Sequence, residues 1–340
     1  MDNDNRTEIR LALPSKGRLA DEAMALLERA GLPVYKPNPR QLKAHIPAMP
    51  ELTVMFQRAG DIVLSVRDGI VDFGITGWDM VAERGGGSPS ILPMHRALGF
   101  GHCTLNLIVP ESMEGVYRVS DLKNWAKSRS APLRVATKFP NLTGEFLRRH
   151  GFDAFRLIAA EGALEIAPTI GYADIISDLV STGATLRENR LRALEDGEIL
   201  ASQACLIANR ERLRRRPAVL AVAKQLLELI VAHLRAAENT AVFANIRGSS
   251  PEEIAGKMLT RPTLAGLQGP TISPVITQSG GNWFAVHIIV PKARLQQAIA
   301  ELRSIGGSGV VVTPVTYIFE EEPLEYRQML AALQNSEKEE

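Results

Sequence analysis

The residues Ile175-Ile-Ser-Asp-Leu-Val-Ser-Thr-Gly-Ala-Thr185 carry the most informative pattern in this chain. An apolar run ends near an acidic residue, Asp178, and a turn of small residues follows. Gly183 permits a close approach of the backbone or an unusual dihedral, and a short helix beginning at Ala184 would point the positive end of its dipole at an anion. The hydroxyl donors of the turn are Ser181, Thr182 and Thr185. The pattern predicts an anion-binding turn at the end of a buried strand.

Three carboxylates accompany this turn. Asp178 cannot help to bind phosphate, but a carboxylate can accept hydrogen bonds from the two hydroxyls of a sugar. If residues 172–180 form a strand, its period of two places Asp174 on the same face as Asp178. Glu165 lies on a predicted helix over 161–170, just before that strand. Sugar and phosphate together indicate a ribose 5-phosphate site; the alternative is a capped strand-to-helix turn without a ligand.

Composition bounds the class of protein. The 340 residues are 45% hydrophobic and 23% charged, which is typical of a globular protein with two or three domains. A formal net charge of +1 gives no electrostatic reason to expect a nucleic-acid partner or an anionic membrane. We expect no membrane span, and the start Met-Asp-Asn-Asp-Asn lacks the pattern of a signal peptide. The two cysteines, Cys103 and Cys205, lack metal-ligand spacing and favour a reducing, cytoplasmic setting.

A second candidate turn lies near the N-terminus. A strand over 9–14 precedes the loop Ser15-Lys-Gly-Arg18, and a helix follows from Leu19 to about Ala30. Glycine between Lys16 and Arg18 is typical of a phosphate-facing turn. The alternative is a solvated basic loop.

The middle of the chain alternates short apolar strands with helices, which indicates an open α/β sheet. The expected strands are 62–66, 71–77, 103–110 and 133–137, and a helix is expected over 142–150. A long, mostly apolar helix over 211–239 links this part to the next.

The remaining segment has the order strand, helix, strand, strand, helix, strand. The expected elements are 240–247, 251–259, 271–277, 283–290, 292–304 and 309–319, with a hairpin connection at 278–282. This βαββαβ order is that of a ferredoxin-like sandwich. The acidic tail over 320–340 contains a short helix candidate at 326–333 and then frays.

Several motifs, taken in order, resemble one family: the long form of ATP phosphoribosyltransferase, the first enzyme of histidine biosynthesis. The motifs are Leu13-Pro-Ser-Lys-Gly-Arg-Leu19, Asp72-Phe-Gly-Ile-Thr-Gly77, Arg134-Val-Ala-Thr-Lys-Phe-Pro-Asn141, Glu165-Ile-Ala-Pro168 and the stretch 173–186. In the βαββαβ segment the resemblance rests on Pro270-Thr-Ile-Ser-Pro274, Ile305-Gly-Gly307 and Val312-Thr-Pro314. The loop Asp79–Gly87 and the tail past Glu320 are departures from the family pattern.

The resemblance implies two α/β domains built like those of periplasmic binding proteins, with the active site between them, and a C-terminal ferredoxin-like, ACT-like regulatory domain. The implied division is domain one over 1–98 and 191–210, domain two over 99–190, a linker helix over 211–239, the regulatory domain over 240–320 and the tail over 321–340. It further implies that the chain crosses back into domain one after about Leu191.

The resemblance also implies the chemistry. ATP and phosphoribosyl pyrophosphate (PRPP) would be the substrates, with Mg²⁺ as cofactor. The PRPP-binding loop would consist of Ser181, Thr182, Gly183, Ala184 and Thr185. Asp178 would bind the ribose, and Glu165 and Asp174 would lie beside the ribose hydroxyls or the metal-bound pyrophosphate. Lys16, Arg18 and Arg58 would reach pyrophosphate or the phosphates of ATP. The rival class is a non-catalytic, periplasmic-type module that binds a small solute.

Regulation is implied in the same way. L-histidine would bind the C-terminal domain and inhibit the enzyme, and the chain would assemble into a homo-hexamer of dimers. Thr271 and Ser273, beside the turn at Gly307, would hold the carboxylate and ammonium groups of histidine. Asn245 stands in the first strand of this domain, where the family often has an acid.

Overall fold

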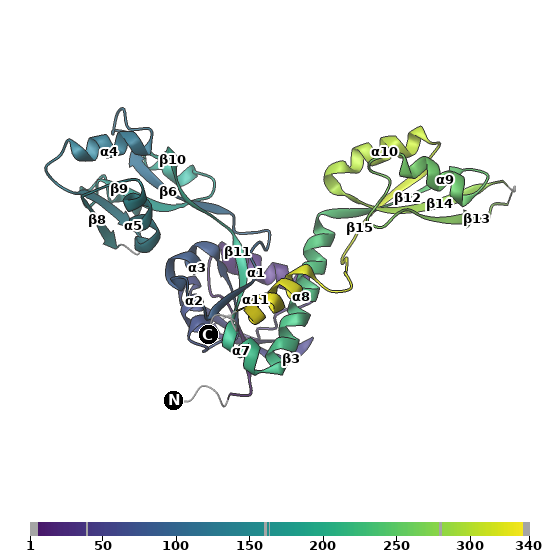
Figure 1. The fold of residues 1–340 in the computed structure, drawn as a ribbon, viewed down its shortest axis with the longest axis horizontal. Coiled ribbons are helices and arrows are strands. Elements are labelled where there is room, and N and C mark those ends of the chain that lie inside the picture. Colours follow the sequence, from purple (N-terminus) through teal and green to yellow (C-terminus); the bar gives the residue numbers. More distant parts are fainter. Residues whose placement is uncertain (1–5, 39, 160–161, 163, 279–280, 336–340) are drawn as a thin grey trace. The chain divides into compact units, whose positions relative to one another are not determined.

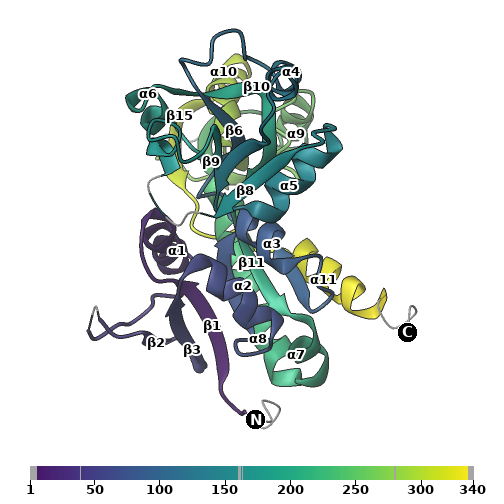
Figure 2. The same ribbon diagram turned by 90° about the vertical axis from the view of Figure 1, so that its left-hand side faces the viewer.

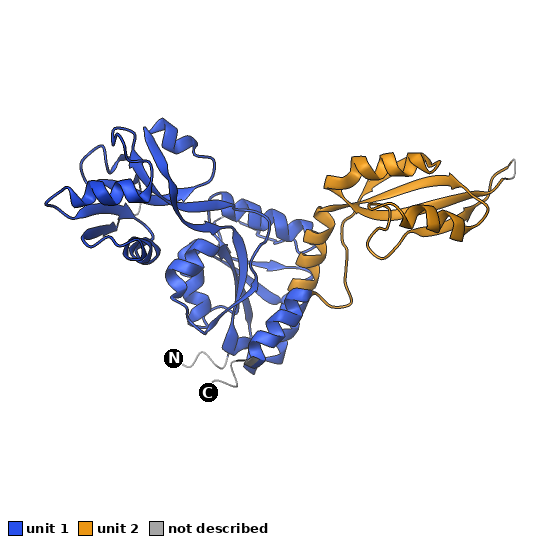
Figure 3. Ribbon diagram, turned by 45° about the horizontal axis from the view of Figure 1, so that its top comes forward, with its two compact units in different colours: residues 1–224, 324–340 blue, residues 225–323 orange. Residues whose placement is uncertain are grey.

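A computed structural model describes residues 6–38, 40–159, 162, 164–278 and 281–335 of the chain. The chain divides into two compact units (Figure 3). The first consists of Met1–Lys224 and Leu324–Glu340, and the second of Gln225–Pro323. The first unit contains two sheets and the second contains one (Figure 1). The fold is α/β, with two α/β lobes in the first unit and a ferredoxin-like second unit.

The first lobe is built on a six-stranded sheet in the order β2-β3-β1-β4-β11-β5. Its strands are β1 (Ile9–Pro14), β2 (Lys43–Ile46), β3 (Met49–Gln57), β4 (Phe73–Gly77), β5 (Ile91–His95) and β11 (Ala204–Asn209). Its helices are α1 (Arg18–Arg29), α2 (Ala59–Arg67) and α3 (Trp78–Gly85), and α2 lies against β1 and β4 (Figure 2). β1 pairs in parallel with both β3 and β4. Central parallel strands are covered on both faces, which explains the nearly continuous apolar sequence of β1.

Two local predictions in this lobe were wrong. The run Ile62–Val66, expected as a strand, lies inside α2, where Ile62, Val63 and Val66 are buried on one face. A short apolar run does not by itself distinguish a strand from a buried helix. The segment expected as a loop over Asp79–Gly87 largely forms α3.

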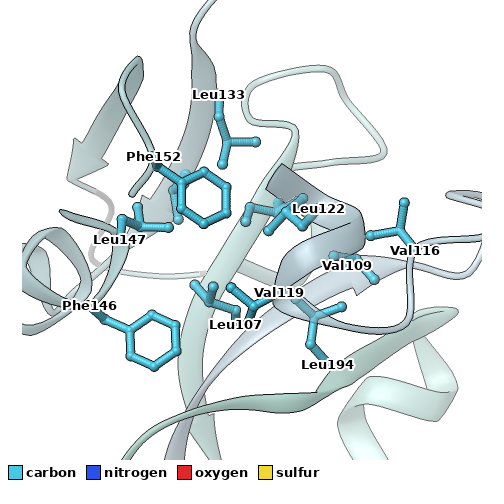
Figure 4. Packing of buried hydrophobic residues seen from close by; sticks show 12 residues of the cluster. Leu107, Val109, Val116, Val119, Leu122, Leu133, Phe146, Leu147, Phe152 and Leu194 are labelled. Carbon is cyan, nitrogen blue, oxygen red and sulfur yellow. The ribbon is translucent and has the colours of Figure 1, made fainter. Parts of the chain in front are cut away.

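The second lobe is built on a five-stranded sheet in the order β10-β6-β9-β7-β8. Its strands are β6 (Cys103–Pro110), β7 (Leu133–Thr137), β8 (Phe155–Ala159), β9 (Ile175–Val180) and β10 (Leu191–Ser202). Its helical segments are α4 (Val119–Lys127), α5 (Pro140–Arg149), the 3₁₀ turn η2 (Leu164–Ile166) and α6 (Ala184–Glu188). Leu107 of β6, Leu122 of α4 and Leu147 of α5 meet in its core (Figure 4). Each such buried side chain stabilises the fold by about 1.5–3 kcal/mol.

Two connections join the lobes. Residues 96–102 lead from β5 to β6, and Gln203 leads from β10 back to β11. β10 pairs with β6 as far as the partners Ser202 and Cys103. The chain therefore returns to the first lobe at Gln203, and the expected return after about Leu191 was too early.

Three further boundaries differ from the sequence prediction. Of the expected helix over 161–170, Glu161 and Ala163 lie outside the described residues, and the described part forms only η2 and turns, because Pro168 cannot continue a helix. β9 begins at Ile175 and not at residue 172. The expected single helix over 211–239 is two helices, α7 (Arg210–Arg215) and α8 (Pro217–Ala237), separated at Arg216. Proline disfavours a helical conformation in the residue before it.

The second unit has the predicted βαββαβ order. Its elements are β12 (Asn239–Arg247), α9 (Pro251–Leu259), β13 (Thr271–Val275), β14 (Trp283–Pro291), η3 (Lys292–Arg294), α10 (Leu295–Ser304) and β15 (Ser308–Pro314). The antiparallel sheet has the order β13-β14-β12-β15, and both helices pack on the face that carries Val242 and Val286. The ferredoxin-like fold is thus confirmed. Part of the predicted hairpin connection, residues 279–280, lies outside the described residues.

The end of the described chain belongs to the first unit. Helix α11 (Leu324–Asn335) packs beside β5 and buries Tyr326, Met329 and Leu333. The side chains of Arg210 and Arg214 donate hydrogen bonds to carbonyl oxygens of its last turn. Residues 324–335 are therefore an ordered helix in a tail that the sequence suggested would fray beyond residue 333.

One helix bears on the expectation that the chain has no membrane span. By length and composition alone, α8 is long and apolar enough to cross a membrane. The same property is found in core helices of water-soluble proteins, and α8 buries Val219, Leu226 and Leu227 within the protein. It is weak evidence for a membrane span.

Candidate functional site

The basic residues of the first lobe gather where parallel strands end. Pro14 at the end of β1 is the register partner of Gln57 at the end of β3, and the Ser15 N–H donates to the Gln57 carbonyl at 2.8 Å. The loop with Lys16 and Arg18 follows β1, and Arg58 follows β3. Ligands of open α/β sheets bind at this edge, outside the carboxyl ends of the strands.

A cavity of ≈ 380 Å³ opens beside this edge, within the first unit. The first lobe contributes Arg18, Leu19, Ala59, Gly77, Asp79 and Met80 to its wall, and the second contributes Lys138, Phe139, Asp178, Leu179 and Ser181. Gly101 and Cys103, at the connection between the lobes, complete it. The two lobes thus form one cavity with cations and carboxylates on both sides.

The predicted anion turn has the expected local geometry. It follows β9, and Gly183 has φ 69° and ψ 7° at the start of α6, a left-handed conformation that glycine adopts without strain. Most side chains of the turn are exposed, and together with Glu165 they line a hollow of ≈ 90 Å³. Asp178, Leu179 and Ser181 line this hollow and the larger cavity. An anion on the turn would therefore lie next to a second ligand in the cavity.

Arg187 is a cation that the sequence analysis did not include. Its Nη1 atom lies 3.3 Å from the position that a Cβ atom on Gly183 would occupy. Because residue 183 is glycine, the guanidinium can approach the turn closely. A cation four residues after the glycine, in the first helical turn, is the signal that could have identified it.

Asp178 and Glu165 face the same small hollow. Burial raises the pKa of the Asp178 carboxyl above its ordinary value, and the charge of Glu165 acts in the same direction. The Leu179 N–H, which donates to Asp178 Oδ1 at 2.8 Å, and the nearby Lys138 oppose this rise. Two neighbouring carboxylates are stabilised by hydroxyl donors or by a cation, so the pair fits a sugar diol and also a Mg²⁺ ion.

Asp174 does not belong to this pair. It precedes β9, and its carboxylate accepts hydrogen bonds from the Arg134 backbone N–H at 2.8 Å and from the Arg134 side chain at 2.9 Å. Arg129 forms a second ion pair with it at 3.0 Å. Four strand residues span about 13 Å, so the shared face predicted for Asp174 and Asp178 does not place both at one ligand. Asp174 is a structural ion-pair partner here.

The three predicted cations differ in position. Arg18 lines the cavity and lies 3.8 Å from Glu22 one helical turn away. Lys16 is exposed in the same loop, and Arg58 is exposed at the start of α2, next to the cavity residue Ala59. All three lie at the same edge of the sheet, but only Arg18 is among the cavity residues.

Asp79 is a buried carboxylate in the cavity wall that sequence reasoning did not identify as functional. Ser202 donates to Asp79 Oδ1 at 2.7 Å, and the Asp79 N–H donates to the Ser202 hydroxyl at 2.9 Å. Burial raises the pKa of Asp79, and the hydrogen bond from Ser202 partly offsets the rise. Burial, with the Asp79 charge added, also raises the pKa of the Cys103 thiol. Cys103 is therefore a neutral thiol at this wall and a poor nucleophile.

The predicted effector residues lie on the second unit, on the sheet face opposite its helices. Ser273, Ala285, Asn245 and Ser308 are register partners across all four strands, so they form one row. Thr271 starts the adjacent row, which continues with His287 and Phe243. Gly307 precedes the row at Ser308, and a Cβ atom there would lie 2.6 Å from the Leu302 carbonyl oxygen, so only glycine fits.

Metal ligands do not cluster in the way a dedicated metal site requires. Among the residues that the structure describes, no group of three or more His, Cys, Asp or Glu side chains could hold a metal ion. Magnesium is commonly bound by one or two carboxylates together with substrate phosphates, and the pair of Asp178 and Glu165 matches that donor set.

The chain is similar to known proteins in sequence and in structure. The profile of the family "HisG: ATP phosphoribosyltransferase" matches residues 58–235, and that of "HisG, C-terminal domain" matches 236–317. The chain is 44% identical to ATP phosphoribosyltransferase 2, chloroplastic, of Arabidopsis thaliana over 337 residues, which are 96% of this chain and 81% of the relative. It is 35% identical over 311 residues to the ATP phosphoribosyltransferase of Methanothermobacter thermautotrophicus, covering 92% of this chain and 99% of the relative.

Among solved structures, one similar chain comes from the ATP phosphoribosyl transferase (HisG:HisZ) complex of Thermotoga maritima. The TM-score is 0.52 at 26% sequence identity, and the match covers 66% of this chain and 98% of the other. The resemblance noted in the sequence is thus borne out along the chain.

Proposed function

The chain belongs to the ATP phosphoribosyltransferase family, and from that premise we propose how its cavity binds the two substrates. The enzyme condenses ATP with PRPP to N1-(5-phosphoribosyl)-ATP and pyrophosphate, the first step of histidine biosynthesis. The observation that carries our assignment is the shared wall of the hollow and the cavity, Asp178, Leu179 and Ser181. Such a wall suits a sugar that is held by its 5-phosphate and reacts at its other end.

PRPP takes the second lobe. Its 5-phosphate binds the turn from Ser181 to Thr185, where backbone N–H groups, hydroxyls and the guanidinium of Arg187 are available. Asp178 accepts hydrogen bonds from the ribose hydroxyls through the oxygen that the Leu179 N–H leaves free, and Glu165 lies beside it. Asp174 has no part in this arrangement.

ATP takes the first lobe. Its base enters the cavity toward Asp79, and its phosphates extend to Arg18, with Lys16 and Arg58 at the same sheet edge. The carboxylate of Asp79 accepts a hydrogen bond from the exocyclic amino group of adenine. That amino group becomes a stronger donor as the ring nitrogen N1 gains positive charge, so this contact strengthens in the transition state.

The reaction requires no nucleophile from the protein. Adenine N1 forms a bond to ribose C1 while the bond from C1 to the pyrophosphate oxygen breaks, and the electron pair leaves with pyrophosphate. The protein holds the two polyanions in line and stabilises charge on the leaving group through Arg18 and Lys138. A nucleophile supplied by ATP agrees with the poor nucleophilicity of the Cys103 thiol at the cavity wall.

Enzymes of this kind generally use a divalent metal, and we assign Mg²⁺. Asp178 and Glu165 would hold it together with phosphate oxygens of PRPP. When bound, Mg²⁺ supplies positive charge that favours departure of pyrophosphate.

Regulation and assembly extend the proposal. L-histidine binds the open sheet face of the second unit along the row with Ser273 and Asn245, beside Thr271 and Gly307, and inhibits the transfer. We further propose that the enzyme assembles into a homo-hexamer of dimers and is located in the cytoplasm. In the full-length chain, Asn245→Ala and Ser273→Ala should each weaken histidine inhibition without changing kcat. Unchanged inhibition in both variants would place the effector elsewhere.

Release of pyrophosphate tests the catalytic assignment. Purified protein with Mg²⁺, ATP and PRPP should release pyrophosphate, and omission of either substrate should abolish the release. A protein that binds both compounds but releases none would be a binding module instead of an enzyme.

A further inference from the structure

Helix α5 of the second lobe lacks an N-terminal cap of its own. Its N-cap residue, Phe139, makes no side-chain capping bond, and Pro140 occupies the first helical position without an N–H. The next two N–H groups, of Asn141 and Leu142, would need an acceptor from outside the helix.

That acceptor comes from the other lobe. Glu83, in α3, accepts the Asn141 N–H on Oε1 at 2.9 Å and the Leu142 N–H on Oε2 at 3.0 Å. The Asn141 side-chain amide donates to the Glu83 backbone carbonyl at 3.0 Å. We name this set of three hydrogen bonds the Glu83 latch.

The carboxylate of the latch is shielded from solvent, and its neighbours favour its negative charge. Glu83 is 4% exposed, and burial raises its pKa, while the two N–H donors and the charge of Arg84 act in the opposite direction. Arg84 also forms an ion pair with Asp61 of α2 at 3.5 Å, so its positive charge interacts with both carboxylates. A carboxylate at a helix N-terminus interacts favourably with the helix dipole, and more strongly when partly buried.

Both ends of the latch lie close to the cavity. On α3, Asp79 is four residues before Glu83 and hence one helical turn away, and it lines the cavity. On the other side, Lys138 and Phe139 immediately precede α5 and line the same cavity. The latch therefore ties the wall with Asp79 to the wall with Lys138.

We propose that Glu83 is a positioning residue for phosphoribosyl transfer, which holds the two lobes in the arrangement where ATP on one and PRPP on the other can react. This inference rests on the substrate assignment above. The N-terminus of α5 holds the two lobes together, while the turn at residues 181–185 binds the phosphate.

The latch predicts a specific kinetic pattern. Its residues do not touch the turn that binds PRPP, so a broken latch should leave equilibrium binding of PRPP alone within a factor of about two. The reaction needs both lobes, so kcat/KM for ATP should fall about tenfold or more, as expected when charge-assisted hydrogen bonds are lost. A purely structural cap would instead lower stability and both quantities together.

The test compares Glu83→Gln, Glu83→Asp and a control, Glu145→Gln, on the exposed face of α5. Glu83→Gln replaces one acceptor by an N–H donor that opposes the helix end, whereas Glu83→Asp keeps the charge with a shorter reach. Glu145 is exposed and forms an ion pair with Arg149 of its own helix at 2.9 Å. We expect the loss in Glu83→Gln, partial rescue in Glu83→Asp and wild-type kinetics in the control.

A second measurement is independent of the reaction. Hydrogen exchange of the amides of Asn141 and Leu142 should be about tenfold faster in Glu83→Gln than in wild type, and unchanged in Glu145→Gln. If the wild type catalyses no transfer and exchange is still faster in Glu83→Gln than in the wild type, the substrate assignment is refuted but the contact between the lobes stands. Wild-type kinetics in a folded Glu83→Gln would overturn the positioning role, as would equal losses in PRPP binding and in kcat/KM.

Discussion

Replacing Asp178 by asparagine exchanges one carboxylate oxygen for an NH₂ group in the wall that the cavity and the small hollow share. In the wild type, Oδ1 accepts the Leu179 N–H at 2.8 Å, which leaves Oδ2 for a ribose hydroxyl. Asparagine keeps one acceptor but presents an NH₂ group to the sugar or removes the acceptor from Leu179. Either orientation loses a negative charge beside the developing positive charge on the ribose. Losing such a contact costs roughly 2.7–4 kcal/mol, so we expect kcat/KM to fall about 10²–10³-fold.

The assay is pyrophosphate release at saturating Mg²⁺ with each substrate varied in turn. The matched control is Asp153→Asn, an exposed carboxylate of the second lobe that lies outside both the cavity and the small hollow. The control should behave as wild type, and both variants should keep the wild-type melting temperature within a few degrees. Near-normal kinetics in a folded Asp178→Asn would show that the turn after β9 does not hold the reacting sugar.

Further predictions concern the turn, the cations, acid stability and the last helix. Thr182→Val should lower kcat/KM for PRPP about 10²-fold by removing one phosphate donor, and an unchanged kcat/KM would contradict this. Arg18→Ala should raise KM for ATP more than KM for PRPP in steady-state assays. The ion pairs of Asp174 outweigh its burial and lower its pKa below 3.8, so Asp174→Asn should lower the melting temperature at pH 7, and the difference should shrink as pH falls below that value. Ending the chain after Pro323 should reduce the free energy of unfolding by roughly 1.5–3 kcal/mol for each large buried side chain of α11, measured by chemical denaturation.

Local patterns predicted the parts of the site that depend on neighbouring residues. The turn around Gly183 was identifiable because a positive φ, small side chains and a following helix are adjacent in sequence. The βαββαβ order of the second unit was predictable for the same reason, since each element carries its own periodicity and each connection its own turn residues.

Contacts between distant segments were not predictable from these patterns. Asp79 and Ser202 are hydrogen-bonded across 123 positions, and Glu83 and Asn141 across 58. Strand period placed Asp174 on one face with Asp178, but the pairing of β9 with β7 brings Asp174 to the backbone and side chain of Arg134. The apolar run at Ile62–Val66 suited a strand as well as a helix until the sheet supplied the face against which it packs.

The identity of the product tests the central claim most directly. Purified full-length protein should be incubated with ATP, PRPP and Mg²⁺, and the product examined by mass spectrometry and by NMR of the bond between ribose and base. Our account predicts one N1-(5-phosphoribosyl)-ATP for each pyrophosphate released. Recovery of unchanged ATP, with PRPP intact or merely hydrolysed, would contradict it.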